Sequence, residues 1–293
     1  MRIRQMTALL AVGLLVAGCG RGGGGTSAGT EDDPITIGVV NAAEPYWQTF
    51  IDLAAADGIS VELQNFSDYQ LPNQALADGQ LDLNQFQHLQ FLAQFNVNAG
   101  TDLVPIGATA VYPLGLYSLR HSSLDSIPDG GQVAIPNDPT NQARALLVLK
   151  AAGLVALTGG GNSFSTTADI DQDASTVTVT AVDAAQTAIA LQDVDAAIIN
   201  NDFVGQAGLT LSDALYADDP SSPDAEPYIN IFVARAADAD NETFARLVNI
   251  YHDPSVTDGV IESSGGTGVI MDNSPADLQR ILAYIEDNFR QAS

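Results

Sequence analysis

Short apolar runs alternate along the chain with longer segments in which apolar residues recur every three or four positions. The first pattern is typical of a buried strand, and the second of a helix that packs one face against a sheet. We therefore expect strands at 35–40, 59–66, 81–86, 133–136, 176–182 and 195–199. We expect helices at 46–58, 72–81, 88–100, 143–154, 187–191, 242–251 and 275–289. Strands and helices that alternate in this order predict an α/β fold.

Two longer β-rich runs, residues 103–119 and 227–235, bracket a middle segment that has its own alternation of strands and helices. A run of this length can cross from one lobe to another. The simplest arrangement is two α/β lobes joined by two hinge crossovers, with a ligand cleft between the lobes. The first lobe would then comprise residues 34–112 and 227–293, and the second lobe residues 113–226.

The N-terminus has the form of an export signal. Two arginines precede a short apolar run, and the small residues Ala17 and Gly18 precede Cys19. The run is shorter than the roughly 20 residues of a membrane-spanning helix. The V-A-G-C ending resembles the lipobox of bacterial lipoproteins, which implies a signal peptide over 1–18 and a lipid on Cys19. Residues 19–33 would be a flexible tether on the extracytoplasmic face of the cell membrane. The alternative is an ordinary signal peptide in which Cys19 is incidental.

Charge and cysteine content exclude two classes of function. The chain carries 36 acidic and 10 basic residues, for a formal net charge of -26, so it is not expected to bind nucleic acid. The acidic residues are spread along the chain, which favours a soluble surface over a specific cation site. Cys19 is the only cysteine, so disulfides within the chain are excluded and thiol catalysis is not expected.

The motifs of common enzymes are missing from the sequence. It contains no G-x-S-x-G, no H-E-x-x-H and no G-x-x-x-x-G-K-[ST]. Its histidines lack the spacing of a metal site. We expect a monomeric binding protein without cofactor or metal. The enzyme alternative is an exported hydrolase that uses His88 with Asp68 or Asp82.

Arg144 is the cation that most needs an explanation. It lies in the first turn of the helix expected at 143–154, where the helix dipole disfavours a cation by roughly 0.3 to 1 kcal/mol. Free backbone N–H groups at a helix start bind anions, and an arginine beside them adds a bidentate clamp for a carboxylate or phosphate. The alternative is an ion pair with a nearby acid such as Asp138.

Four motifs occur in an order that resembles a known family. They are F-x-D-Y-x-x-P-N-x-A-L from Phe66, F-Q-H from Phe86, A-I-P-N-D-P-T-N-x-x-R-A-L from Ala134 and P-Y-I-N from Pro227. In these motifs the chain is similar to the methionine-binding lipoprotein family (NlpA type), the substrate-binding components of amino-acid ABC importers. The resemblance implies a two-lobe periplasmic-binding-protein-like fold, a role in capturing L-methionine, and delivery to a permease driven by a separate ATPase.

The resemblance also implies roles for individual residues. Tyr69, Phe86 and His88 would form the pocket for the apolar side chain of the ligand. Arg144 would hold the ligand carboxylate with Asn141 beside it, and the amino or carboxylate group would be bound by Asn200 and Asn230. Other interpretations are core packing for the two aromatic residues, helix capping for His88 and Asn141, and turn positions for Asn200 and Asn230.

Three positions depart from the family pattern. Tyr46 and Trp47 stand where the family commonly has histidine, and Tyr112 stands where many members have an acid. The ligand could therefore be another amino acid or a short peptide. A further alternative is a surface lipoprotein with a degenerate pocket that acts in adhesion or assembly.

Overall fold

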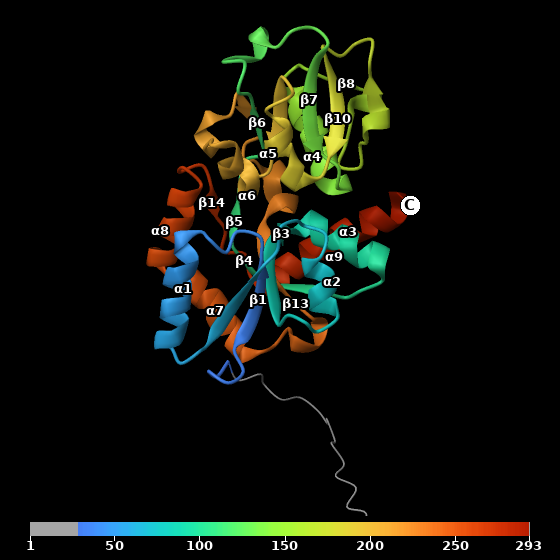
Figure 1. The fold of residues 1–293 in the computed structure, drawn as a ribbon. Coiled ribbons are helices and arrows are strands. Elements are labelled where there is room, and N and C mark those ends of the chain that lie inside the picture. The colour runs from blue at the N-terminus through green and yellow to red at the C-terminus, as the bar shows by residue number, and fades with distance from the viewer. Residues whose placement is uncertain (1–28, 293) are drawn as a thin grey trace, which may run out of the picture.

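The computed structural model describes residues 29–292 (Figure 1). The predicted signal peptide and Cys19 lie outside the described residues. Two five-stranded sheets form the framework, one in the lower half of Figure 1 and the other in the upper half. We call the elements around the lower sheet lobe 1 and those around the upper sheet lobe 2. Among the described residues, no helix is long and apolar enough to cross a membrane.

Lobe 1 is built from both ends of the described chain. Its sheet has the order β2-β1-β3-β13-β4, in which β1 runs parallel to β2 and β3, and β13 runs antiparallel to β3 and β4. The strands are β1 (Ile35–Val39), β2 (Val61–Asn65), β3 (Leu83–His88), β4 (Val104–Ala108) and β13 (Asn230–Ala234). The helices are α1 (Pro45–Ala56), α2 (Pro72–Ala77), α3 (Leu89–Ala99), α7 (Glu242–Tyr251), α8 (Pro254–Ser263) and α9 (Pro275–Ala292).

Lobe 2 is built from the middle of the chain. Its sheet has the order β10-β7-β11-β6-β12, with β7 parallel to β10 and β11, and β6 antiparallel to β11 and β12. The strands are β6 (Gly115–Tyr117), β7 (Gly131–Pro136), β10 (Val177–Val182), β11 (Ala196–Ile199) and β12 (Tyr216–Ala217). The helices are α4 (Pro139–Ala151), α5 (Ala184–Ala190) and α6 (Asn201–Val204).

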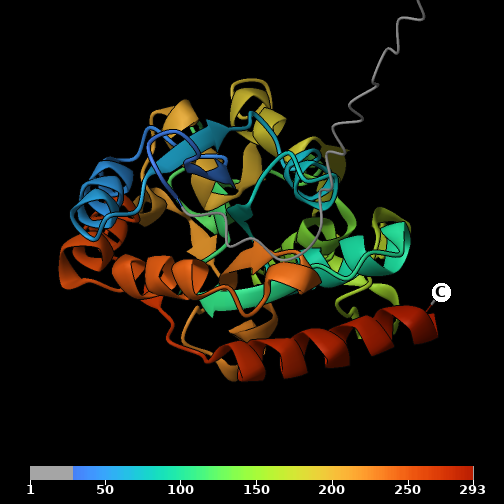
Figure 2. The ribbon, with the colours of Figure 1, turned by 90° about the horizontal axis from the view of Figure 1, so that it is seen from below.

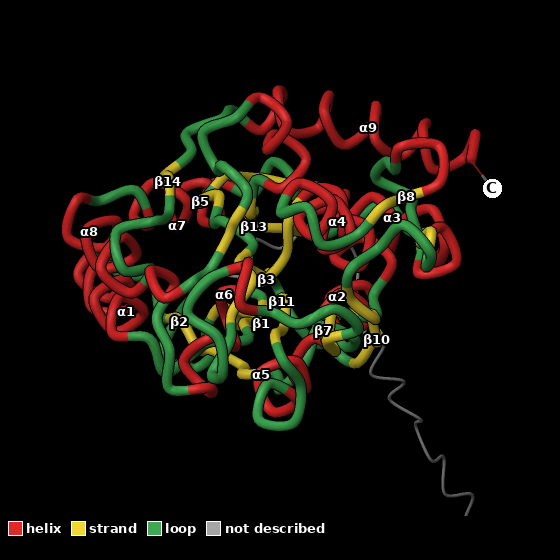
Figure 3. Tube along the Cα trace, turned by 90° about the horizontal axis from the view of Figure 1, so that it is seen from above, coloured by secondary structure: helices red, strands yellow, loops and turns green. Residues whose placement is uncertain are grey.

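Two short pairs of strands complete the fold. β5 (Ala110–Val111) pairs with β14 (Val269–Ile270), and β8 (Ala156–Leu157) pairs with β9 (Ile170–Asp171). Seen from below in Figure 2, the C-terminal helix α9 lies along one side of lobe 1, where it packs on α3 and β4. Figure 3 shows the molecule from the opposite end, with the helices of lobe 1 at its sides.

The two predicted crossovers between the lobes differ in secondary structure. The run 103–119 contains β4, β5 and β6, and it does pass from the sheet of lobe 1 to that of lobe 2. The run 227–235 also belongs to the return from lobe 2 to lobe 1, although its strand part is short. The chain returns from lobe 2 through a 3-10 helix, Pro223–Tyr228, and β13 lies wholly in the sheet of lobe 1.

Candidate ligand-binding site

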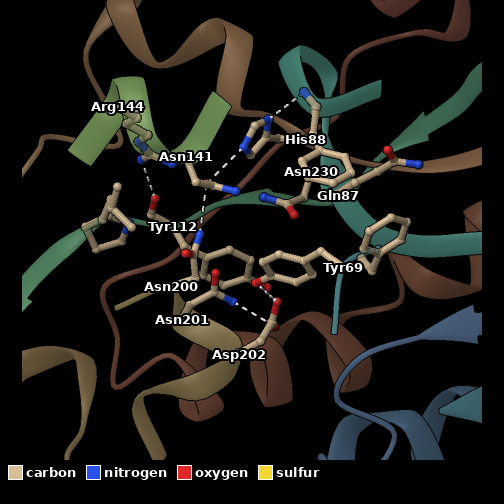
Figure 4. A pocket seen from close by; sticks show the side chains of 14 residues that line it. Tyr69, Gln87, His88, Tyr112, Asn141, Arg144, Asn200, Asn201, Asp202 and Asn230 are labelled. Atoms are coloured by element: carbon tan, nitrogen blue, oxygen red, sulfur yellow. Dashed lines mark hydrogen bonds between the residues drawn. The ribbon is translucent and has the colours of Figure 1, made fainter. Parts of the chain in front are cut away.

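The carboxyl ends of the parallel strands place the polar residues between the lobes. β3 of lobe 1 ends at His88, while β7 leads into α4 and β11 leads directly into Asn200. In open α/β sheets, ligands bind in the crevice outside these strand ends. A cavity lies there. Its lining comprises Tyr69, Phe86, Gln87, His88, Phe91, Tyr112, Pro113, Leu114, Asn141, Arg144, Asn200, Asn201, Asp202 and Asn230 (Figure 4).

All of the ligand-binding residues expected from the sequence line this one cavity. They come from segments far apart in the chain, on both lobes. Every one of them except Asn230 is buried, with side chains that are at most 7% exposed. Their role toward a ligand stays a prediction, but the fold brings them together as that prediction requires.

The wall contributed by lobe 1 is aromatic. The ring centroids of Tyr69 and Phe86 are 5.9 Å apart, and that of Phe91 lies 6.1 Å from Tyr69 and 5.8 Å from Phe86. Edge-to-face and tilted ring pairs of this kind are favourable. Phe91 is absent from the residues expected from the sequence. It lies one helical turn after His88, which is the signal that could have placed it at the same end of α3.

His88 caps α3 and also faces the cavity. Its Nδ1 accepts a hydrogen bond from the backbone N–H of Phe91 at 3.1 Å, so the ring proton lies on Nε2, which is 3.4 Å from Oδ1 of Asn141. Burial, and secondly the charge of Arg144, lower the pKa of His88 to about 3. His88 is therefore neutral near pH 7. Neither Asp68 nor Asp82 hydrogen bonds to it among the described residues, which removes the basis for the hydrolase alternative.

Two expectations about the start of α4 are wrong. The helix begins at Pro139, not at 143, so Arg144 lies in its second turn and the dipole argument does not apply. The anion at the helix start is internal, because Oδ1 of Asp138 accepts the backbone N–H of Asn141 at 3.0 Å. The side chain of Asp138 is the N-terminal cap of the helix.

Arg144 has an acidic partner, but the partner is Asp218 and not Asp138. Its Nε and Nη2 donate to the two carboxylate oxygens of Asp218 at 2.7 and 3.1 Å, and Nη2 also donates to the carbonyl oxygen of Tyr112 at 2.9 Å. The guanidinium lies 4.1 Å from the ring centroid of Tyr228, in cation-π contact. Among the described residues, no hydrogen bond is made by Nη1. Arg144 lines the cavity, so Nη1 is the guanidinium nitrogen left for a partner outside the described residues.

Asn200 offers the cavity an acceptor. Its Nδ2 donates to Oδ1 of Asn141 at 2.9 Å, while its own Oδ1 is buried and has no hydrogen-bond partner in the part of the chain that the structure describes. Asn230 pairs directly with His88 across β13 and β3. Its side chain makes only a long bond, 3.4 Å, to the carbonyl oxygen of Tyr228. Both amides are thus available to a ligand.

Asp202 is another lining residue that was not expected from the sequence. Its Oδ2 accepts from the hydroxyl of Tyr69 at 2.7 Å and its Oδ1 from Nδ2 of Asn41 at 3.2 Å, so this carboxylate of lobe 2 joins two residues of lobe 1. Burial raises the pKa of Asp202 to about 6. The polar run from Asn200 to Asp202 was visible in the sequence, but nothing there distinguished its last residue.

The three departures from the family pattern separate in space. Tyr112 lines the cavity. Trp47 and Tyr46 do not line it, but they hold Asn41: Nε1 of Trp47 donates to Oδ1 of Asn41 at 3.0 Å, and Nδ2 of Asn41 lies 2.9 Å from the hydroxyl of Tyr46. Their hydrogen bonds are connected to the cavity through the bond from Asn41 to Asp202.

Comparison with known proteins gives the family. Residues 35–271 match the family model described as NlpA lipoprotein. The chain belongs to the NlpA lipoprotein family. This confirms the family expected from the four motifs. Within the described residues no group of three or more histidine, cysteine, aspartate or glutamate side chains could hold a metal ion.

Several relatives of this NlpA lipoprotein are named as binding proteins. The D-methionine-binding lipoprotein MetQ of Salmonella typhi is 36% identical over 263 residues, which cover 87% of this chain and 93% of the relative. The crystal structure of the substrate binding protein of a methionine transporter from Streptococcus pneumoniae is 36% identical, with a TM-score of 0.76, and the match covers 81% of this chain and 95% of that one. A nutrient binding protein from Burkholderia cenocepacia bound to methionine is 34% identical, with a TM-score of 0.74, and the match covers 80% and 99%.

These similarities confirm two more expectations. The two-lobe α/β fold of a substrate-binding protein is correct, since the solved structures with that fold match most of the chain. The chain is a member of a family of binding lipoproteins and is not an enzyme.

Proposed function

We propose that this NlpA lipoprotein captures methionine in the cavity between its lobes and delivers it to the permease of an ABC importer, which a separate ATPase drives. The lipid on Cys19 would hold it at the extracytoplasmic face of the membrane as a monomer. The boundaries proposed for the lobes are 34–112 with 227–293, and 113–226. The names of the relatives support the ligand and the transporter.

The observation that carries the proposal is the combination of free atoms on one wall and rings on the other. Lobe 2 offers the donor Nη1 of Arg144 and the acceptor Oδ1 of Asn200. Such a pair suits the carboxylate and the ammonium of an amino acid. Lobe 1 offers the rings of Tyr69, Phe86 and Phe91. A thioether gains about 0.3 to 1.5 kcal/mol from each sulfur–ring contact.

Ligand binding would favour the closed arrangement of the lobes. Only a closed cavity satisfies the ends of the amino acid from lobe 2 and its side chain from lobe 1 at the same time, so bound ligand shifts the population toward closure. The permease would then recognise the closed form. This division of labour requires no ATP site on the chain.

The first test is to purify the protein from Gly20 onward, denature it, and identify the released small molecules by mass spectrometry. We expect methionine in near-stoichiometric yield. Arg144→Ala protein purified in the same way is the control and should release much less. Release of a different amino acid or of a short peptide would support the binding function but show that the ligand is not methionine. If nothing is released, calorimetric titration with L-methionine and with D-methionine decides whether the protein binds methionine. The absence of binding heat with both enantiomers would contradict the proposal.

The titration also addresses the enantiomer. The resemblance found in the sequence implies L-methionine, whereas the relative from Salmonella typhi is named for D-methionine. We propose the L form as the preferred ligand, and tighter binding of D-methionine would correct this point alone.

A further inference from the structure

A buried carboxylate outside the cavity lining holds one end of the Asn141 side chain. Asp138 is 6% exposed, and its oxygens accept from Nδ2 of Asn141 at 3.0 and 3.1 Å, besides the backbone N–H of the same residue. Burial raises the pKa of Asp138, although the hydrogen bonds of Asn141 oppose this. An ionised carboxylate only accepts hydrogen bonds. The amide of Asn141 must therefore turn its NH₂ to Asp138 and its oxygen to the opposite side.

The oxygen of Asn141 receives two donors from the other side. Nδ2 of Asn200 lies 2.9 Å away and Nε2 of His88 lies 3.4 Å away. Figure 4 marks both hydrogen bonds with dashed lines. The direction of the second bond is fixed independently, because Nδ1 of His88 accepts the backbone N–H of Phe91. The helix cap of α4 and the helix cap of α3 thus impose the same orientation on Asn141.

Fixing Asn141 also fixes Asn200. Since Nδ2 of Asn200 is used on Asn141, its oxygen is the atom left without a partner, buried at the cavity. A buried acceptor without a donor is unfavourable until a ligand supplies one. We propose that Asp138 is a positioning residue that, through Asn141, makes Asn200 present an acceptor to the ammonium group of the ligand. This inference rests on the proposed capture of an amino acid.

The substitution Asp138→Asn tests whether Asp138 sets the orientation of the Asn141 and Asn200 amides. An asparagine keeps the helix cap, but its NH₂ can donate to the oxygen of Asn141 and so favours a flip of that amide. Asn200 would then turn its NH₂ toward the ligand ammonium. We expect the affinity for L-methionine to fall about 30-fold. The affinity for 4-(methylthio)butanoate, which is methionine without its amino group, should change by less than about threefold.

Asp253→Asn is the matched control. Asp253 caps α8 by accepting the backbone N–H of Ser255 at 2.9 Å, and it does not line the cavity. The same chemical change at a helix cap should leave the binding of both compounds unaltered. Equal losses for both compounds in Asp138→Asn would make Asp138 merely structural and overturn the proposal. If that variant does not fold, Asp138→Ser, which keeps a capping oxygen but can also donate, should give a smaller loss confined to methionine.

A second readout needs no ligand. Nitrogen NMR of the His88 ring should show the proton on Nε2 in the wild-type protein, because Nδ1 accepts the backbone N–H of Phe91. In Asp138→Asn the ring should keep this tautomer, but its Nε2–H should lose the acceptor on Asn141 and change its NMR signal. A proton on Nδ1 in the wild type, or an unchanged Nε2–H signal in the variant, would overturn the proposal. Failure of the wild type to bind methionine would instead contradict the proposed function, so the two failures are distinguishable.

Discussion

The two walls of the cavity differ in how their side chains are held. On the wall from lobe 1, the rings of Tyr69, Phe86 and Phe91 contact one another and form an apolar surface. On the wall from lobe 2, Arg144 and Asn200 are each bonded to another residue and retain one free polar atom. The wall from lobe 1 thus supplies an apolar contact surface, while the wall from lobe 2 supplies hydrogen-bonding atoms with a fixed orientation. Holding polar groups in place before the ligand arrives reduces the entropy lost on binding.

The pairing of Arg144 with Asp218 sharpens this contrast. The charge of the guanidinium is already balanced by a bidentate carboxylate, so its free Nη1 acts as an oriented donor more than as an unbalanced cation. In the proposed function, selectivity for the ligand carboxylate would then depend on geometry. The predictions below test whether the division between the walls is real.

Arg144→Ala should have the largest effect. We expect it to weaken methionine binding by about 2 to 4 kcal/mol, because the ligand carboxylate is left buried without its donor. Calorimetric titration measures the change. The control is Arg280→Ala, which removes an exposed arginine paired with Asp277 and should leave the affinity unchanged. Unaltered affinity in Arg144→Ala would remove Arg144 from the site.

Phe86→Leu tests the wall of lobe 1. We expect a loss of about 1 kcal/mol, because ring contacts with the thioether are reduced. The loss should be the same for 4-(methylthio)butanoate, which has the same side chain, and competition titrations can compare the two. Phe244→Leu, at a buried ring outside the cavity, should lower the melting temperature without changing either affinity. A loss confined to methionine would show that the walls do not divide the ligand in this way.

Asn230→Ala asks whether a polar residue of lobe 1 acts on the ligand. We expect binding to weaken by about 1 kcal/mol, while the melting temperature without ligand hardly changes, because the side chain has only one long internal hydrogen bond. Asn84→Ala is the contrasting variant. Its amide is fully buried and bonded to Asn73 and Gln87, so that substitution should lower the melting temperature. A large loss of stability in Asn230→Ala would make Asn230 structural.

Asp202→Asn tests the carboxylate that joins the lobes, with an effect of about 1 kcal/mol or less. The pKa of Asp202 is raised to about 6 by burial, above its value of about 3.9 in an unfolded chain. The folded protein therefore binds the extra proton between these values, and the stability contributed by Asp202 rises as pH falls from about 7 to about 4. The variant should lack this gain.

Urea denaturation at pH 7.5 and pH 5 measures that difference. Relative to the variant, the wild type should gain free energy of unfolding on acidification, reduced by the partial exposure of the side chain. Asp102→Asn, at an exposed position, should follow the wild type. Parallel changes in wild type and Asp202→Asn would contradict the assignment of this proton to Asp202.

Helices and strands with strong hydrophobic periodicity could be predicted from the sequence, whereas elements without it were missed. Helix α8 was not expected because its sequence contains β-branched residues and Gly259, which are weak helix formers. Tertiary packing stabilises this helix, because Val256 and Val260 are fully buried one turn apart. A side chain at Gly259 would meet Cβ of Tyr46 at 2.9 Å, so the glycine permits close contact between α8 and α1.

The site shows the same limit. The family resemblance gave residues that all line one cavity. Three of the motifs lie at the carboxyl ends of β2, β3 and β7, and P-Y-I-N leads into β13 beside β3. They could not give the partner of Arg144, because Asp218 lies 74 residues away in the chain. They could not single out Asp202, whose role depends on Tyr69 of the opposite lobe. Contacts between distant segments follow from the fold and not from local patterns.

A crystal structure of the wild-type protein with L-methionine would test the central claim most directly. The account predicts a carboxylate oxygen within hydrogen-bond distance of Nη1 of Arg144, the ammonium nitrogen within that distance of Oδ1 of Asn200, and the thioether against the rings of Tyr69 and Phe86. A ligand in the reverse orientation, with its ammonium beside Arg144 or its side chain against lobe 2, would contradict it.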